Sequence, residues 1–194
     1  MCSYLIPLAI ALAGALAGCS KSDMPASQPE SKPVEATQSE SSKPVLDACA
    51  LLTNEEIASV QSEEVKETKK LEESEGGLIV SVCQFSLPTP GNSIILRLVQ
   101  RDGSEGRDPR QGWNEAFAPE KMQNPKETGR KKIALPEKIP DLGDEAYWRG
   151  NSKSGALYVL KGNAYLRLAL IDSRDKESAI KKCSALAAMA LKRL

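Results

Sequence analysis

The sequence predicts one α+β domain over residues 47–194, in which an antiparallel sheet is packed by a short N-terminal helix and an amphipathic C-terminal helix. Residues 156–161 and 164–171 are typical of a β-hairpin, because a two-residue Gly-Asn loop joins two strand-like runs. Residues 176–193 repeat apolar side chains at helical spacing. Strands grouped together with helices at the chain ends favour the α+β class.

The domain begins with a helix-start signal. Thr53 is a candidate N-cap, and Glu56 follows three residues later as in a capping box. Leu52 and Ile57 fit a hydrophobic staple around the same turn. We therefore expect a short helix over residues 54–61.

Three strand-like segments come next, at residues 65–69, 78–87 and 93–101. Gly76-Gly77 and the turn-forming residues 88–92 separate them. These segments are expected to supply the first strands of the sheet.

The Gly162-Asn163 loop sets the register of the later hairpin. One face then carries aliphatic cross-strand pairs, Leu157 with Leu168 and Val159 with Leu166. The other face carries Tyr158, Leu160, Tyr165 and Arg167. The aliphatic face is expected to pack on a helix, whereas the second face is a candidate binding surface.

The closing helix is the expected partner of the aliphatic face. Its apolar stripe consists of Ile180, Cys183, Ala187, Ala190, Leu191 and Leu194. Asp175 and Glu177 at its start, and Lys192 and Arg193 at its end, complement the helix macrodipole.

Between residues 102 and 132 the chain is polar and rich in Gly and Pro. Trp113 and Phe117 lie four residues apart there, which predicts one short helix lying on the core. The alternative is that the two aromatic residues form an exposed anchor for a partner.

The N-terminal region predicts a lipoprotein signal. An apolar run over residues 5–17 ends in Leu16-Ala17-Gly18-Cys19, which reads as a lipobox, and the run is too short to span a bilayer. We expect residues 1–18 to be removed and Cys19 to be lipidated, so that the lipid anchors the protein in a bacterial cell envelope. By resemblance to Gram-negative lipoproteins, Ser20 implies the periplasmic face of the outer membrane. A buried apolar helix that happens to end in Cys is the alternative.

Residues 19–46 are expected to form the lipidated cysteine and a disordered tether. Ser, Pro, Glu, Lys and Gln dominate, and such a segment cannot bury enough apolar surface to offset its ordering entropy. Its root-mean-square reach is roughly 30 Å. A spacer that keeps the domain clear of lipid headgroups is favoured over a leash sized for a partner.

Four features occur in a fixed order, namely residues 47–53 (DACALLT), Cys83-Gln84-Phe85, residues 142–148 (LGDEAYW) and the final hairpin with its helix. Together they resemble a family of small bacterial lipoproteins known as domain of unknown function 3558, over most of residues 47–194. The resemblance implies a PsbP-like α/β/α sandwich with helices on both faces of the sheet. No catalytic residues are established for that family, so it implies none here.

Three cysteines remain in the mature chain. Two of the three are expected to pair in an oxidising envelope. Chain entropy gives about 3.8 kcal/mol for Cys49–Cys83 and about 5 kcal/mol for Cys49–Cys183, which does not decide between them. Cys183 lies on an apolar stripe, whereas the other two fall within the family-like phrases. Cys49–Cys83 is therefore the favoured pair and Cys49–Cys183 the alternative.

Composition excludes several classes of function. The chain has no histidine, which removes Ser-His-Asp and Cys-His catalysis and His-containing zinc sites. Its 26 basic and 26 acidic residues leave no positive excess for nucleic acid. No phosphate-binding glycine motif occurs. No catalytic residue, metal site or cofactor is predicted.

The sequence thus favours a non-enzymatic binding or interaction module. A protein or small ligand would contact residues 102–132 or the face of Tyr158, Tyr165 and Arg167. The alternative is an envelope hydrolase that uses Asp144 or Glu145, which cluster with Asp141 before a strand. A solvated turn explains the same three carboxylates more simply.

Overall fold

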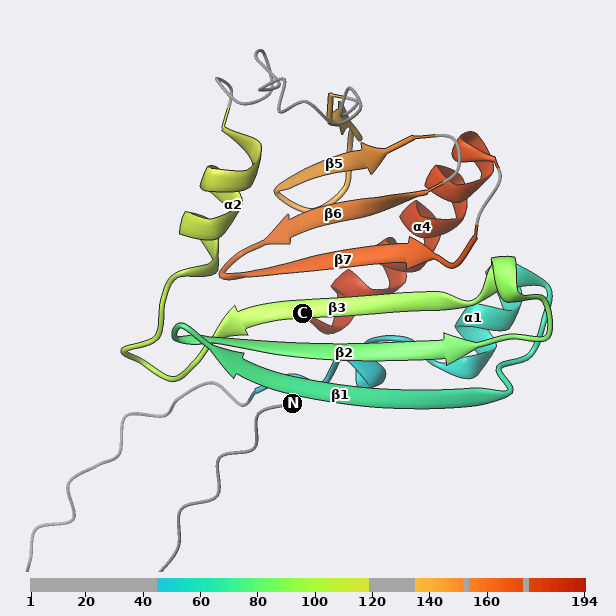
Figure 1. The fold of residues 1–194 in the computed structure, drawn as a ribbon, viewed down its shortest axis with the longest axis horizontal. Coiled ribbons are helices and arrows are strands. Elements are labelled where there is room, and N and C mark those ends of the chain that lie inside the picture. The colour runs from blue at the N-terminus through green and yellow to red at the C-terminus, as the bar shows by residue number, and fades with distance from the viewer. Residues whose placement is uncertain (1–44, 119–134, 152–153, 173–174) are drawn as a thin grey trace, which may run out of the picture. The chain divides into compact units, whose positions relative to one another are not determined.

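A seven-stranded antiparallel sheet forms the centre of the computed structural model, which describes residues 45–118, 135–151, 154–172 and 175–194. Its order is β1-β2-β3-β7-β6-β5-β4, so the last strand of the chain pairs with the third (Figure 1). The strands are β1 (Glu67–Glu75), β2 (Leu78–Ser86), β3 (Ile94–Arg101), β4 (Glu137–Lys138), β5 (Glu145–Gly150), β6 (Gly155–Lys161) and β7 (Ala164–Leu170). The helices are η1 (Ala48–Leu51), α1 (Asn54–Gln61), η2 (Pro90–Asn92), α2 (Pro109–Phe117), α4 (Lys176–Ala190) and η3 (Leu191–Arg193).

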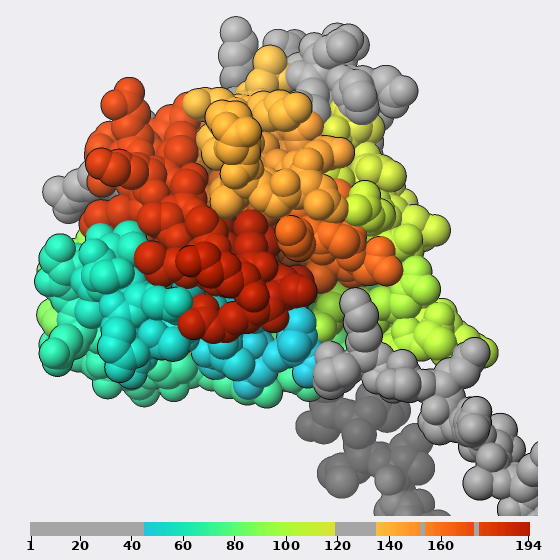
Figure 2. Space-filling view, turned by 180° about the vertical axis from the view of Figure 1, so that it is seen from behind, coloured from blue at the N-terminus to red at the C-terminus, as the bar shows by residue number. Residues whose placement is uncertain are grey.

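The main hydrophobic core lies between one face of the sheet and the helices from the two ends of the domain, which confirms the α+β prediction. Figure 2 shows the N-terminal segment in cyan and the C-terminal helix in red side by side over this face. Its fully buried members come from the N-terminal helices, from alternate strand positions and from α4: Ala48, Ile57, Cys83, Ile94, Leu96, Leu98, Leu157, Val159, Leu166, Leu168, Cys183, Leu186, Ala187 and Ala190. Arg193 joins the helices at the surface through an ion pair with Glu56 at 2.9 Å.

The first helix forms as the sequence predicts. α1 spans Asn54–Gln61, and Thr53 is its N-cap. The Thr53 hydroxyl accepts a hydrogen bond from the Glu56 N–H at 3.2 Å, and the Glu56 carboxylate accepts one from the Thr53 N–H at 2.9 Å. Both halves of the capping box are therefore present.

The first strand is longer than the expected segment over residues 65–69. β1 continues to Glu75, and all nine of its residues are exposed. Its sequence, ETKKLEESE, lacks the alternation of apolar and polar residues that marks a half-buried strand. Antiparallel pairing with β2 over its whole length holds it in place. The two-residue Gly76-Gly77 loop between the strands is the local signal of this hairpin.

The later hairpin has the register that the Gly162-Asn163 loop predicts. Leu157 lies opposite Leu168 and Val159 opposite Leu166, and all four side chains are buried in the main core. Gly162 adopts φ +55°, a left-handed conformation that glycine accepts without a Cβ clash.

The closing helix also lies where its periodicity places it, although its last turn differs. α4 ends at Ala190, and residues 191–193 form the 3₁₀ helix η3. Asp175 caps the start, where its carboxylate accepts hydrogen bonds from the Glu177 and Ser178 N–H groups at 3.3 and 3.0 Å. Cys183, Ala187 and Ala190 of the predicted stripe are fully buried.

One helix packs on the opposite face of the sheet. α2 begins at Pro109 after the N-cap Asp108, and it lies across one end of β5, β6 and β7 (Figure 1). Proline at the first helical position is pre-set for helix and lacks only an N–H that would have no intrahelical partner. The sheet therefore carries helices on both faces, with α2 covering part of the second.

Candidate functional site

The candidate site is the sheet surface that points away from α1 and α4. Strand register places Leu71, Val82, Arg97, Arg167, Tyr158 and Tyr147 in one row across six strands. We call the surface formed by Leu71, Val82, Ile95, Arg97, Tyr158, Tyr165 and Arg167 the open face. Leu71 and Arg97 are exposed and the other five side chains are partly buried.

An aromatic cluster under α2 borders the open face. It consists of Trp113, Phe117, Tyr147, Tyr158 and Tyr165. Phe117 stacks on Tyr147 at a ring-centroid distance of 5.0 Å and meets the edge of Tyr158 at 5.3 Å. Trp113 lies 6.0 Å from Tyr165. Such pairs stabilise by geometry as well as by burial.

Trp113 and Phe117 are consequently core residues of this cluster. They are 2% and 6% exposed. The short helix that their spacing predicts is present, but the alternative of an exposed anchor does not fit their burial. Tyr158 and Tyr165 lie partly under the same helix, so only part of each ring is accessible.

Polar contacts hold the start of α2 against the hairpin. The Arg110 guanidinium forms an ion pair with Asp144 at 2.7 Å and donates to the Gly162 carbonyl at 2.8 Å. Asp144 also accepts the Gly162 N–H at 2.9 Å. Three segments distant in sequence are thus joined through one carboxylate.

The carboxylates that the sequence singles out therefore have structural partners. Glu145 accepts the Trp113 indole N–H at 3.2 Å and the Tyr147 hydroxyl at 3.4 Å. Asp141 lies in the turn before β5 with a left-handed φ of +56°. The turn interpretation of this cluster matches these contacts.

Arg167 contacts Tyr158 on the open face through both a hydrogen bond and its guanidinium plane. Its Nε donates a hydrogen bond to the Tyr158 hydroxyl at 3.2 Å, and its guanidinium lies 5.8 Å from the centre of the Tyr158 ring. That distance is within the range of a cation–π contact. The three predicted residues Tyr158, Tyr165 and Arg167 are brought together on one surface.

Arg97 lies directly opposite Arg167 on the neighbouring strand and is not among the site residues that the sequence predicts. The available signal was a single charged residue within the apolar run of β3, IILRLV. Which strand β3 pairs with cannot be read from that run, because β3 and β7 are far apart in the chain.

Burial raises the pKa of two tyrosines of the aromatic cluster, Tyr165 and Tyr147. Burial raises the pKa of Tyr165, although the positive charges of Arg97 and Arg107 oppose the shift. Burial followed by the negative charge of Glu145 raises the pKa of Tyr147. Both hydroxyls remain protonated hydrogen-bond donors at neutral pH.

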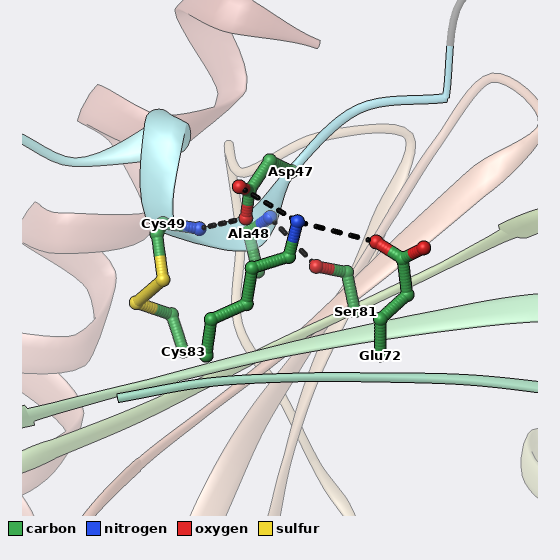
Figure 3. The surroundings of a disulfide bond; sticks show 7 residues. Asp47, Ala48, Cys49, Glu72, Ser81 and Cys83 are labelled. Carbon is green, nitrogen blue, oxygen red and sulfur yellow. Dashed lines mark hydrogen bonds and ion pairs between the residues drawn. A yellow bond between two sulfur atoms is a disulfide. The ribbon is translucent and has the colours of Figure 1, made fainter. Parts of the chain in front are cut away.

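The favoured cysteine pair is bonded on the helical side of the sheet. Cys49 of η1 joins Cys83 of β2 (Figure 3). Beside it, the Ala48 N–H donates to the Ser81 hydroxyl at 3.0 Å, and Asp47 accepts the Cys49 N–H at 2.9 Å. These contacts fix the first turn of the domain on the sheet.

Lys70 adds a charged partner at the same place. Its ammonium lies 3.0 Å from the Asp47 carboxylate and 3.4 Å from that of Glu72. Partial burial opposes ionisation of Asp47, but the Cys49 N–H and Lys70 outweigh it and hold the pKa of Asp47 below its usual value.

Cys183 is a free thiol in the core. Burial raises its pKa to about 12. Because the thiolate is the reactive form of cysteine, the Cys183 thiol has low nucleophilic reactivity in the folded protein. The sulfur lies 4.0 Å from the Leu168 carbonyl oxygen.

Two further findings, on metal ligands and on membrane-spanning helices, concern the described residues only. Among them, no group of three or more His, Cys, Asp or Glu side chains is placed to hold a metal ion. Nor does any helix in the described ranges have the length and apolar character needed to cross a bilayer. The predicted lipidation site, Cys19, and residues 119–132 of the candidate loop lie outside the described residues.

Comparisons with known proteins identify no family for this chain. No family model and no curated protein matches the chain, so the resemblance to domain of unknown function 3558 stays a prediction. A crystal structure of a GTP binding regulator from Thermotoga maritima is similar over 73% of this chain and 89% of that protein, at 7% identity and a TM-score of 0.37. A likeness at that level carries no argument about function.

Proposed function

We propose that this protein is a lipid-anchored binding module of the bacterial cell envelope that engages a ligand or partner through the open face. The lipobox at Cys19 and the tether-like composition of residues 20–45 support the location. A disulfide between Cys49 and Cys83 fits an oxidising compartment.

The observation that carries the binding role is the pairing of Arg97 and Arg167 on an accessible part of the sheet. Two charged side chains placed opposite each other at the centre of a sheet face do not serve packing. Partly buried Tyr158 and Tyr165 beside them offer rigid rings and hydroxyl donors, which are common in binding surfaces.

We favour binding over carboxylate-dependent hydrolysis. The Asp144 carboxylate is held by Arg110 and the Gly162 N–H, and Glu145 accepts from Trp113 and Tyr147. Both groups thereby serve to hold α2 on the sheet, which is a sufficient reason for their presence.

The proposal is tested by photocrosslinking in cells that make the full chain. A photoreactive amino acid at Leu71, on the open face, should give a specific adduct. The same amino acid at Ala188, exposed on α4, is the matched control and should give none. Equal adducts from both positions, or adducts from Ala188 alone, would contradict the proposal.

Anchoring is tested separately by metabolic labelling with palmitate. The Cys19→Ala chain should lose incorporation of radiolabelled palmitate, whereas Cys183→Ala should incorporate it normally. Unchanged labelling of the Cys19→Ala chain would remove the lipoprotein part of the proposal.

A further inference from the structure

The two arginines of the open face form a pair of like charges. Arg97 of β3 and Arg167 of β7 are direct cross-strand partners in antiparallel register. Side chains in that relation have Cβ atoms about 4.5–5.5 Å apart, and like charges so placed destabilise a sheet. The pair therefore needs a reason other than stability of the empty fold.

Their surroundings supply no counter-charge. The neighbouring positions on the same face are Val80, Val82, Gln84, Ile95, Val99, Tyr158, Tyr165 and Ala169. None is acidic, and within the described part of the chain neither guanidinium takes part in an ion pair. The acidic residues of this face lie on strands toward its two sides: Glu67, Glu73 and Glu75 on β1, and Glu145 on β5. The centre of the open face is thus locally positive in a chain with no net charge.

Arg167 is already oriented for a ligand. Its Nε is occupied by the Tyr158 hydroxyl, which fixes the plane of the guanidinium. A guanidinium has five N–H donors, so its terminal amino groups stay available. Because the Tyr158 oxygen accepts from Arg167, its own O–H remains free to donate.

We propose that Arg97 and Arg167 bind a phosphate group, with the Tyr158 hydroxyl as a third donor. This inference rests on the proposed function, because it names the ligand chemistry of the same surface. Arginine pairs match phosphate oxygens through parallel N–H donors, and a phosphate has enough oxygens to satisfy two guanidiniums together. The Tyr165 ring beside the pair gives the non-phosphate part of the ligand a surface for contact.

The test uses NMR of the full chain in detergent, observing the arginine Nε–Hε resonances during titration with sodium pyrophosphate at constant ionic strength. Resonances of Arg97 and Arg167 should shift together and saturate. Arg97→Gln and Arg167→Gln should each weaken binding about tenfold, since one charged hydrogen-bonding group is lost.

Arg149→Gln is the matched control. Arg149 is exposed on β5, on the same side of the sheet but outside the pair, and its substitution removes the same charge. Binding should be unchanged in that chain. Equal weakening in all three variants would show diffuse electrostatic attraction and overturn the proposal, as would the absence of saturable shifts at Arg97 and Arg167.

The source of the phosphate is settled by a second arm with the lipidated chain in nanodiscs. Shifts of both resonances in phosphatidylglycerol, and not in phosphatidylcholine, would identify a lipid headgroup. Saturable shifts with added glycerol phosphate in phosphatidylcholine discs would identify a soluble phosphorylated ligand. Photocrosslinks at Leu71 without any phosphate response would overturn this inference while leaving the proposed function standing.

Discussion

Arg97 and Cys183 lie on opposite sides of the sheet and differ in their expected effect on stability. Arg97 is exposed opposite another arginine, whereas Cys183 is enclosed by aliphatic side chains of the main core. We expect the first position to lower the stability of the domain through charge repulsion and the second to raise it through burial. Each position makes a prediction that can be checked without knowing the ligand.

Replacing Arg97 by Gln should stabilise the protein. Removing one of two opposed positive charges relieves a repulsion of about 0.2–1 kcal/mol, by analogy with other cross-strand pairs. Urea unfolding should show the gain at low salt and a smaller gain at high salt, because exposed charges are screened. A loss of stability at low salt would mean that Arg97 has an attractive partner.

Cys183 should make stability depend on alkaline pH. Its pKa in the folded chain is about 12, above the ordinary value of 9.0. Above pH 9 the unfolded chain releases the thiol proton while the folded chain keeps it, so the free energy of unfolding falls as pH rises toward 12. The slope from this one group is up to about 1.4 kcal/mol per pH unit.

The Cys183→Ala chain tests that slope. Between pH 9 and 11 its free energy of unfolding should fall less steeply than that of the parent chain. Parallel curves would show that the thiol ionises as easily in the folded protein as in the unfolded one.

At the scale of elements, local signals were read correctly and long-range pairings were not. The capping box at Thr53 and the Gly162-Asn163 loop involve neighbours in the chain, so sequence reveals them. The extent of β1 was underestimated because its charged sequence lacks alternation, although Gly76-Gly77 marks the hairpin. The position of Arg97 opposite Arg167 depends on the pairing of β3 with β7, which no local pattern encodes. The sequence therefore predicts only part of the candidate site: it places Tyr158, Tyr165 and Arg167 together but does not identify Arg97.

The helix α2 should loosen when its cap is removed. Asp108 accepts the Arg110 N–H at 2.9 Å, and replacing such a cap by Ala costs about 0.5–2 kcal/mol. In Asp108→Ala, Trp113 fluorescence should shift to longer wavelength as the indole gains access to water. Asp102→Ala is the control, because it removes an exposed carboxylate that accepts from Ser74 rather than from α2, and an identical shift there would contradict the role of the cap.

At the scale of the whole molecule, the disulfide fastens the start of the domain to β2, the strand next to the edge of the sheet. Cys49 and Cys83 are separated by 34 positions. The sequence favoured this pair because Cys183 belonged to a helical stripe, and in the structure Cys183 is a free thiol buried in the main core. The N-terminal helix α1 lies directly after this cross-link and packs on α4.

Removing the cross-link should destabilise the domain as a unit. The double variant Cys49→Ala, Cys83→Ala should lose about 2–5 kcal/mol of unfolding free energy. Urea midpoints measured by circular dichroism and by tryptophan fluorescence should fall together. Adding a reductant to Cys183→Ala should reproduce the loss, and an unchanged midpoint in both experiments would contradict it.

The charged residues of β1 oppose edge-to-edge association between neighbouring copies of the domain. As the outermost strand of the sheet, β1 leaves one row of backbone N–H and C=O groups without a neighbouring strand. Its glutamates and lysines make annealing with the same strand of another copy costly, because hydrated charges would have to be brought face to face. The sheet thus resists growing into fibres through this edge, and the domain can be crowded at high local concentration with its strands kept apart.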